Sequence, residues 1–277
     1  MTTFQLRADP RGRAQETYGE SVRQVAELCA AYIRGLQGNH SKYLRLAATV
    51  KHYAFYSGPE CDGHAYDGGG CEEFPGVGRG NFNAVVDAQD SFQSYLPMFE
   101  QAVAPAAQGG GGSAALMSSF SHVNGVAMVA NTYLQQTILR ERFGFGDGMI
   151  VTDWGAIGNT MSHDKWVKNQ SQCLTVKCTA QRAADCLLAG TDQDLKGGYF
   201  NIKVGPLTIQ PLPEALKLGL ITESQVDVSV SRVLRVFFRL GRFDPPNLNP
   251  YRQIPFSVMG SQPHRRLAME SNKRKLH

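Results

Sequence analysis

The chain has 277 residues, of which 42% are hydrophobic and 19% are charged, and its formal net charge is +4 at pH 7. These values are typical of a globular protein with a sizeable core, and the charge bias is too small to indicate a nucleic-acid or membrane partner. No apolar stretch of roughly 18 residues occurs, so no transmembrane helix is expected. Residues 1–13 show no apolar signal-peptide segment.

The six cysteines comprise two closely spaced pairs and two isolated thiols. The pairs, each flanking a polar loop, are Cys61 with Cys71 and Cys173 with Cys178. Each pair could form a local disulfide if the protein is secreted. Cys29 and Cys186 lie in helical patterns and are expected to be buried thiols. No spacing of cysteines and histidines indicates zinc, so neither a metal nor a cofactor is expected.

Apolar strands alternate with amphipathic helices along the chain. Glycines at 38, 144 and 190 are expected to end helices, Pro97 to break one, and Thr222 to cap another with Gln225. Residues 59–80 read as a glycine-rich loop, and 109–113 as a turn. Strands are expected at 44–56, 113–120, 148–154 and 191–195. Helices are expected at 19–38, 82–104, 132–144, 175–190, 212–220 and 222–243.

This alternation predicts an α/β fold with a parallel sheet covered on both faces. Polar residues at strand ends favour a partial (β/α)8 TIM-like barrel, in which chemistry gathers at the C-terminal face. About five strand–helix units are visible, whereas a complete barrel has eight. A Rossmann sheet is the alternative, but no GxGxxG follows a strand.

Two expected strands end in residues that are suited to sugar chemistry. Lys51 and His52 close "AATVKH", and Asp153 and Trp154 close "MIVTDW". A carboxylate in this position can attack an anomeric carbon, and the neighbouring indole offers an apolar platform for a sugar ring. Lysine and histidine supply hydrogen-bond donors to hydroxyl groups. The alternative is an Asp that caps the next helix beside a Trp that packs in the core.

The order of the motifs resembles family 3 of the glycoside hydrolases, the β-glucosidase and β-xylosidase group. The matching blocks are "ADPRGRAQETYGES", "GLQG", "AATVKHYAFY", "RGNFNAVVDAQD", "YLPMFEQAV", "MSSFSHVNGVAMVAN", "LRERFGFGDGMIVTDWGAI" and "ALKLGLITESQVD…RVLRVFFRLGRFDPP". They run from about Asp9 to the C-terminal tail and cover most of the chain.

The resemblance implies a retaining, two-step mechanism in which Asp153 is the nucleophile. It also implies a set of substrate-binding residues, each matched to a family motif. These are Arg13, Lys51, His52, Arg79, Met117 and Trp154.

The sequence departs from the family pattern in three places. "DPRGR" lacks the tryptophan of its block, and Phe120 stands where the family has a tyrosine whose hydroxyl contacts the nucleophile. Loss of that hydrogen bond removes about 1.5–3 kcal/mol of stabilisation from the carboxylate. No residue matches the acid/base, although a retaining glycosidase needs two carboxyls about 5–5.5 Å apart. Asp192 and Asp194 could contact substrate or have a purely structural role.

The resemblance implies an exo-acting β-glycosidase with a carbohydrate substrate, hydrolysing terminal β-D-xylosyl or β-D-glucosyl residues. "GRAQET" and "KHYAFY" favour the xylosidase branch, and Trp154 the glucosidase branch. A catalytically impaired remnant or sugar-binding module is the alternative, and a nucleotide-binding protein has no supporting motif.

Residues 1–245 are expected to form an incomplete family 3 barrel domain. Residues 246–277 are expected to form the linker to a C-terminal α/β-sandwich domain and the start of that domain. For the full-length protein we expect an extracellular, vacuolar or lysosomal compartment, and the oligomeric state stays open.

Overall fold

The structure is a computed structural model of the chain. It describes residues 3–4, 17–56, 70–71, 74–75, 82–158, 175–204 and 207–274. The strands are β1 (Thr3–Phe4), β2 (Thr49–Tyr53), β3 (Gly70–Cys71), β4 (Phe74–Pro75), β5 (Asn83–Ala84), β6 (Ala115–Ser118), β7 (His122–Val123), β8 (Val126–Ala127), β9 (Met149–Thr152), β10 (Ile202–Val204) and β11 (Leu207–Ile209). The longer helices are α1 (Val22–Gln37), α3 (Pro97–Val103), η5 (Tyr133–Arg142), α5 (Val176–Ala189), α6 (Pro211–Lys217), α7 (Glu223–Arg239) and α8 (Gln262–Arg274). The short ones are α2 (Ala88–Asp90), η2 (Ser91–Tyr95), η3 (Ala106–Gln108), η4 (Met128–Ala130), η6 (Pro246–Leu248), η7 (Pro250–Gln253) and η8 (Phe256–Val258).

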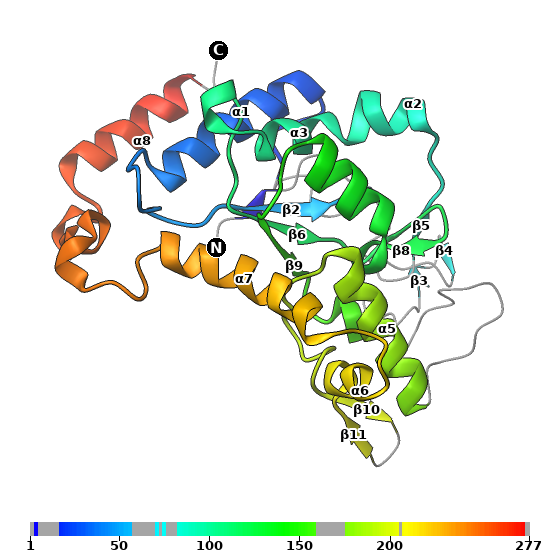
Figure 1. The fold of residues 1–277 in the computed structure, drawn as a ribbon. Coiled ribbons are helices and arrows are strands. Elements are labelled where there is room, and N and C mark those ends of the chain that lie inside the picture. The colour runs from blue at the N-terminus through cyan, green and yellow to red at the C-terminus, as the bar shows by residue number, and fades with distance from the viewer. Residues whose placement is uncertain are drawn as a thin grey trace.

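A parallel sheet forms the centre of the structure, with strand order β1-β2-β6-β9 (Figure 1). A parallel bridge between Val151 and Gln193 adds the segment after α5 to its edge. The sheet is open over the part of the chain that the structure describes. The predicted parallel α/β arrangement is therefore confirmed, whereas closure into a barrel stays a prediction.

One face of the sheet packs against α1, α3 and η5. Side chains alternate between the two faces of a strand, and Val50, Leu116 and Ile150 point to this face. All three are fully buried, together with Ile33 of α1 and Leu139 of η5. Burial of each such side chain contributes roughly 1.5–3 kcal/mol, so this layer is the main core.

The opposite face is covered by α7. Met117, Met149 and Val151 form a smaller cluster there with Val236 of this helix. Figure 1 shows α7 on the other side of the sheet from α1 and α3. In a closed barrel this face would point to the barrel interior, with the helices outside. Because the described sheet is open, apolar residues of α7 cover the face that other strands would cover in a barrel.

Three helices begin at residues whose side chains cap them, and of these caps the one at Thr222 was predicted. Ser21 Oγ accepts from Gln24 N–H at the start of α1, and Thr175 Oγ1 accepts from Cys178 N–H at the start of α5. The capping box of Thr222 with Gln225 opens α7. At the far ends, the glycines at 38 and 190 follow α1 and α5 with φ of 73° and 108°, a conformation that glycine adopts at least cost.

The predicted helix over 82–104 is wrong in its first third. The segment begins with β5, which pairs with β7, because residues 83 and 84 continue a sheet ladder instead of a helix. Helical structure starts only after Asp87, whose side chain accepts from Asp90 N–H. Pro97 then becomes the first residue of α3, so the predicted break is confirmed. The hairpin of β10 and β11 was not predicted.

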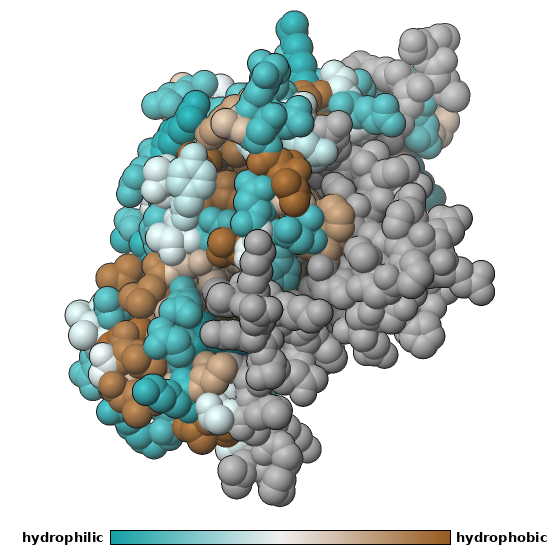
Figure 2. All heavy atoms as spheres, turned by 90° about the vertical axis from the view of Figure 1, so that its right-hand side faces the viewer, coloured by the Kyte–Doolittle hydropathy of each residue, from teal (hydrophilic) through white to brown (hydrophobic). Residues whose placement is uncertain are grey.

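A second core lies between α5 and α6. Alanines at 180, 183, 184 and 215 are fully buried there and let the two helices approach closely. Figure 2 shows the molecule from the side towards which β2 runs in Figure 1. On the described part of this side, hydrophobic residues gather towards the end where α5 and α6 lie.

The cysteines agree with the predictions where the structure describes them. Cys29 and Cys186 are buried free thiols, and burial raises the pKa of Cys29 to about 12. Cys178 is disulfide-bonded, and Cys173 lies outside the described residues. Among the described helices none is long and apolar enough to cross a membrane.

Candidate functional site

The carboxyl ends of β2, β6 and β9 meet at one edge of the sheet. Tyr53 pairs with Ser118, and Ser118 pairs with Thr152, so the three strands end side by side. Asp153 follows Thr152 directly, and its backbone N–H donates to the carbonyl of Ser118 at 3.1 Å. Residues at the ends of these strands therefore reach one common region, as the sequence predicts.

The carboxylate of Asp153 lies beside the imidazole of His52. Asp153 Oδ2 is 3.3 Å from His52 Nε2, and the two side chains are 18% and 1% exposed. Asp153 Oδ1 accepts from the backbone N–H of Trp154 at 2.7 Å. The imidazole also packs against the ring of Tyr56, with 4.6 Å between centroids. The carboxylate is thus held at both oxygens, while part of it remains open to solvent.

Trp154 presents its indole to solvent directly after the carboxylate. The residue is 60% exposed, and Lys196 Nζ lies 5.4 Å from the centroid of the ring. This distance is within the range of a cation–π interaction. The alternative that Trp154 packs in the core is wrong because most of the residue is accessible.

The remaining predicted residues near this edge are buried. Lys51 precedes His52 on β2 and is 8% exposed. Met117 lies in the apolar cluster beneath α7 with Val151 and Val236. The structure therefore brings His52, Asp153 and Trp154 into contact at the end of the sheet, while Lys51 and Met117 lie on the neighbouring strands β2 and β6. Arg13 and Arg79 lie outside the described residues.

Phe120 is buried at the position where the sequence departs from the family pattern. Its ring packs in an apolar cluster with residues such as Tyr56 and Ile157. A phenyl ring has no hydroxyl to donate. Ser119 and Ser121, which precede and follow Phe120 in the sequence, carry hydroxyl groups and were not among the predicted site residues. Both donate to the carbonyl of Ala54, at 3.2 and 3.3 Å, and join the loops that follow β2 and β6.

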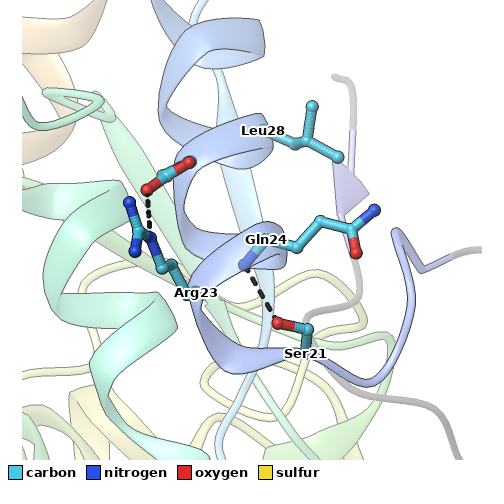
Figure 3. Close-up of a pocket in the computed structure, with 5 residues that line it drawn as sticks. Ser21, Arg23, Gln24 and Leu28 are labelled. Atoms are coloured by element: carbon cyan, nitrogen blue, oxygen red, sulfur yellow. Dashed lines mark hydrogen bonds and ion pairs between the residues drawn. The ribbon is translucent and has the colours of Figure 1, made fainter.

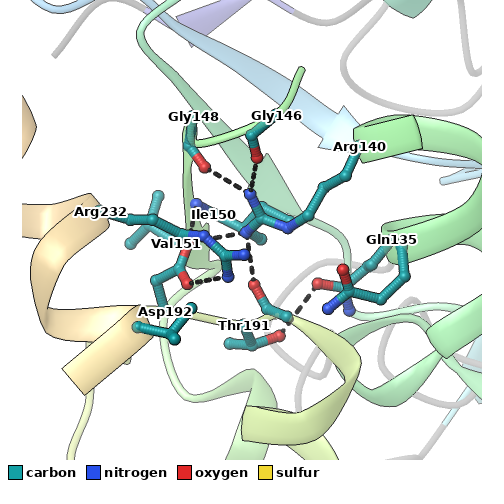
Figure 4. Close-up of polar contacts among 12 residues, drawn as sticks. Gln135, Arg140, Gly146, Gly148, Ile150, Val151, Thr191, Asp192 and Arg232 are labelled. Atoms are coloured by element: carbon teal, nitrogen blue, oxygen red, sulfur yellow. Dashed lines mark hydrogen bonds and ion pairs between the residues drawn. The ribbon is translucent and has the colours of Figure 1, made fainter. Parts of the chain in front are cut away.

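Asp192 lies in a buried ion-pair network (Figure 4). Its carboxylate, with a side chain 0% exposed, accepts from Arg140 at 2.9 Å and Arg232 at 3.1 Å. It also accepts from Ile150 N–H at 2.8 Å, which ties it to β9. Burial raises the pKa of Asp192, and the two guanidinium groups oppose this shift. Burial lowers the pKa of Arg140. Asp192 therefore has a structural role.

Arg140 connects this network to the backbone around β9. Its guanidinium donates to the carbonyls of Gly146 and Gly148 at 2.6 and 2.9 Å, and to that of Gly190 at 2.9 Å (Figure 4). Buried charges of this kind are stable only when their hydrogen-bonding groups are well paired. The network fixes the start of β9 and the segment after α5 to each other.

Asp194 holds a loop against the end of β9. Thr152 Oγ1 donates to Asp194 Oδ1 at 3.4 Å and accepts from Leu195 N–H at 3.1 Å. The other oxygen of Asp194 accepts from Tyr199 N–H at 3.4 Å. These contacts place the segment 193–196 beside the candidate nucleophile, although none of them involves Asp153 itself.

Three hollows in the described part of the chain are not lined by any predicted site residue. A cavity of about 480 Å³ opens between α7 and the sheet and is lined by Met149, Val151 and Val236, among others, but by none of the predicted site residues. A shallow pocket at the start of α1 is lined by Ser21, Arg23, Gln24, Glu27 and Leu28 (Figure 3). Its Arg23–Glu27 ion pair is exposed and contributes little to stability. Within the described ranges no group of three or more potential ligands could hold a metal ion.

The site has the arrangement of an α/β protein with chemistry at the carboxyl ends of parallel strands. The sequence profile of the glycosyl hydrolase family 3 N-terminal domain matches residues 4–236, and the chain belongs to this family. The predicted family is therefore confirmed.

Curated relatives include several β-xylosidases. The chain is 31% identical to the xylan 1,4-beta-xylosidase of Xylanibacter ruminicola over 95% of this chain and 26% of that protein. It is 33% identical to the exo-1,4-beta-xylosidase bxlB of Emericella nidulans over 94% of this chain and 30% of the relative. The chain thus spans less than a third of the length of these relatives.

Solved structures of both branches resemble this chain. A family 3 exo-beta-xylosidase in complex with a xylobiose aziridine probe matches 91% of this chain and 28% of its own, with 29% identity and a TM-score of 0.70. The beta-glucosidase from Listeria innocua in complex with isofagomine matches 92% and 30%, with 27% identity and a TM-score of 0.64.

Proposed function

We propose that this chain carries the nucleophile-bearing part of a retaining, exo-acting β-glycosidase for terminal β-D-xylosyl or β-D-glucosyl residues. The observation that carries the proposal is the carboxylate of Asp153, which stands at the carboxyl ends of the strands with His52 at 3.3 Å. The names of the relatives favour a xylosyl substrate, whereas the similar structures include glucosidases.

In the proposed first step, Asp153 attacks the anomeric carbon of the terminal sugar. A bond forms between its carboxylate oxygen and this carbon, the glycosidic bond breaks, and the electron pair leaves with the aglycone oxygen. In this proposal, His52 and Lys51 donate to sugar hydroxyls, and Trp154 supports a ring. Arg13 and Arg79 are further substrate-binding residues in this proposal, on the family resemblance alone.

In the second step, water attacks the same carbon and releases Asp153. The proton of this water must pass to a second carboxylate about 5–5.5 Å from the first. We assign no residue to this role. In the first step the same carboxyl group would protonate the leaving oxygen, so a natural aglycone, which needs that proton, is harder to release than an activated one. We also propose that residues 1–245 form an incomplete barrel domain, and that residues 246–277 form the linker to a C-terminal domain and the start of that domain.

Hydrolysis of dinitrophenyl β-D-xyloside and β-D-glucoside tests the nucleophile without the acid. Dinitrophenolate leaves without protonation, so a missing acid does not slow the first step. We expect dinitrophenolate release from the first step. Sugar is released only in the second step, more slowly, and we expect the β-anomer to be the first sugar product in a proton NMR time course. An α-anomer formed first would contradict the retaining mechanism.

A catalytically impaired remnant that binds sugar is the second candidate. The buried Phe120 favours it, because this ring cannot donate the hydrogen bond that the family tyrosine gives. Xylose or glucose binding without dinitrophenolate release would support this candidate, and it would overturn the proposed enzyme.

A further inference from the structure

Lys196 lies next to the candidate site, and no predicted role accounts for it. Its ammonium group lies over the ring of Trp154, at 5.4 Å from the centroid. Within the residues that the structure describes, no carboxylate forms an ion pair with it, and the residue is exposed. Among the described residues, this exposed positive charge thus has no ionic partner, and it contacts the residue that directly follows the proposed nucleophile.

The backbone around Lys196 is fixed to the strand that carries the nucleophile. Thr152, the last residue of β9, donates its N–H to Gln193 O at 2.9 Å. Its hydroxyl accepts from Leu195 N–H at 3.1 Å. Because both bonds reach the same segment from the residue that precedes Asp153, the position of Lys196 follows that of the nucleophile.

The stem of Lys196 uses space that a glycine leaves. A Cβ built on Gly155 would lie 3.2 Å from Lys196 Cδ, tighter than most such contacts. The φ of Gly155 is +79°, a backbone conformation that glycine adopts more readily than other residues. The stem thus passes over Gly155, and the head reaches the ring of the preceding residue.

We propose that Lys196 is a specificity-determining residue on the leaving-group side of the site and favours leaving groups that carry a carboxylate. The proposal rests on the proposed function. Lys51 and His52 are buried and suit the terminal sugar of an exo-acting enzyme, whereas Trp154 and Lys196 are exposed. In this proposal the leaving group extends from the anomeric carbon towards solvent and past the exposed pair, so a uronic or aromatic acid there meets the ammonium group.

A matched pair of substrates isolates the charge of the leaving group. The substrates are para-carboxyphenyl and para-carbamoylphenyl β-D-xyloside, which have similar shapes and differ by one negative charge. The readout is the ratio of their kcat/KM values for the full chain and for Lys196→Met, which keeps the length of the stem. We expect the ratio to fall about twofold to fivefold, and the difference to shrink as salt is added.

Lys217→Met is the matched control, because this lysine is exposed on α6 and ion-paired with Glu214. We expect its ratio to equal that of the unchanged chain. Lys196→Glu should lower the ratio further than Lys196→Met does. An unchanged ratio in both Lys196 variants would overturn the proposal, whatever the absolute rates.

A second pair of measurements separates this proposal from the proposed function. The chain has two tryptophans, so Trp166→Phe leaves Trp154 as the reporter. Lys196→Met should lower quenching by the anion iodide about twofold and leave quenching by neutral acrylamide unchanged. Equal changes with both quenchers would contradict the Lys196–Trp154 contact.

The same reporter measures the binding of the corresponding thioglycosides, which are not hydrolysed. If the chain is inactive but still prefers the carboxylate thioglycoside through Lys196, the proposed function fails and the specificity role stands. If neither thioglycoside binds, both proposals are wrong.

Discussion

Asp153 and Asp192 lie close together on neighbouring segments of one sheet, and their surroundings are opposite. Asp153 follows the end of β9, is partly exposed and contacts an imidazole. Asp192 follows α5, and its carboxylate accepts from the N–H of Ile150 in β9. This carboxylate is fully buried and contacts two guanidinium groups. The same residue type near the same strand thus has a reactive setting in one case and a structural setting in the other.

The difference teaches that a strand-end carboxylate is not a site by itself. An enclosed carboxylate with all its oxygens directed to arginines cannot approach a substrate carbon. A carboxylate with a solvent-facing side and one histidine can. Substitutions at the two aspartates test whether Asp153 is reactive and Asp192 structural.

The largest expected effect is the loss of turnover in Asp153→Asn. An amide is a poor nucleophile, so release of dinitrophenolate should fall by at least about 10³-fold. Because Asp153 is partly exposed, urea unfolding should show a change in stability of only about 0.5 kcal/mol. Turnover close to that of the unchanged chain would show that another residue is the nucleophile.

Cys29 is an ionisable side chain that is buried without a charged partner. Burial raises the pKa of this thiol to about 12, so at pH 8 its thiolate fraction is on the order of 10⁻⁴. Alkylation by iodoacetamide should therefore be about 10³-fold slower than for an exposed cysteine and should accelerate as pH rises. Peptide mass spectrometry after timed labelling measures this rate. Rapid labelling in folded protein at pH 8 would show that Cys29 is accessible.

Asp192→Ala should destabilise the chain by about 3–5 kcal/mol, because it leaves Arg140 and Arg232 buried without a counter-charge. Urea unfolding measures this loss. Asp147→Asn is the matched control, since Asp147 pairs with Arg235 on the surface, where an ion pair contributes about 0–1 kcal/mol. Equal losses in the two variants would contradict the buried network.

The smallest expected effect concerns the histidine beside the nucleophile. His52→Asn should slow the first step about 10–150-fold, because a hydrogen bond to a charged group contributes about 1.5–3 kcal/mol. His52→Gln has a longer side chain that keeps an N–H donor within reach, so it should lose less. Pre-steady-state release of dinitrophenolate measures both rates. Equal rates in the two variants and the unchanged chain would show that the 3.3 Å contact does not contribute.

Local signals in the sequence predicted much of the fold. Thr222 marks a helix start through its bond to Gln225, only three positions away, and the glycines at 38 and 190 mark two helix ends. The strand-end residues Asp153 and His52 were placed together because parallel strands share an edge, and the structure confirms their proximity.

Contacts between distant residues could not be predicted in this way. Arg140 and Arg232 lie 52 and 40 positions from Asp192, so no local pattern shows that they enclose it. The packing of α7 depends on which side chains the sheet presents on the face opposite α1 and α3. The contact of Lys196 with Trp154 likewise depends on how the loop after α5 is anchored to Thr152.

The most direct test of the central claim is to trap the proposed glycosyl intermediate. The full chain is incubated with an activated 2-fluoro xyloside or glucoside, and intact mass and peptide mapping locate the adduct. We expect one sugar per chain, bound to Asp153 and missing from Asp153→Asn. An adduct on another carboxylate, or one that persists in Asp153→Asn, would contradict the assignment of the nucleophile.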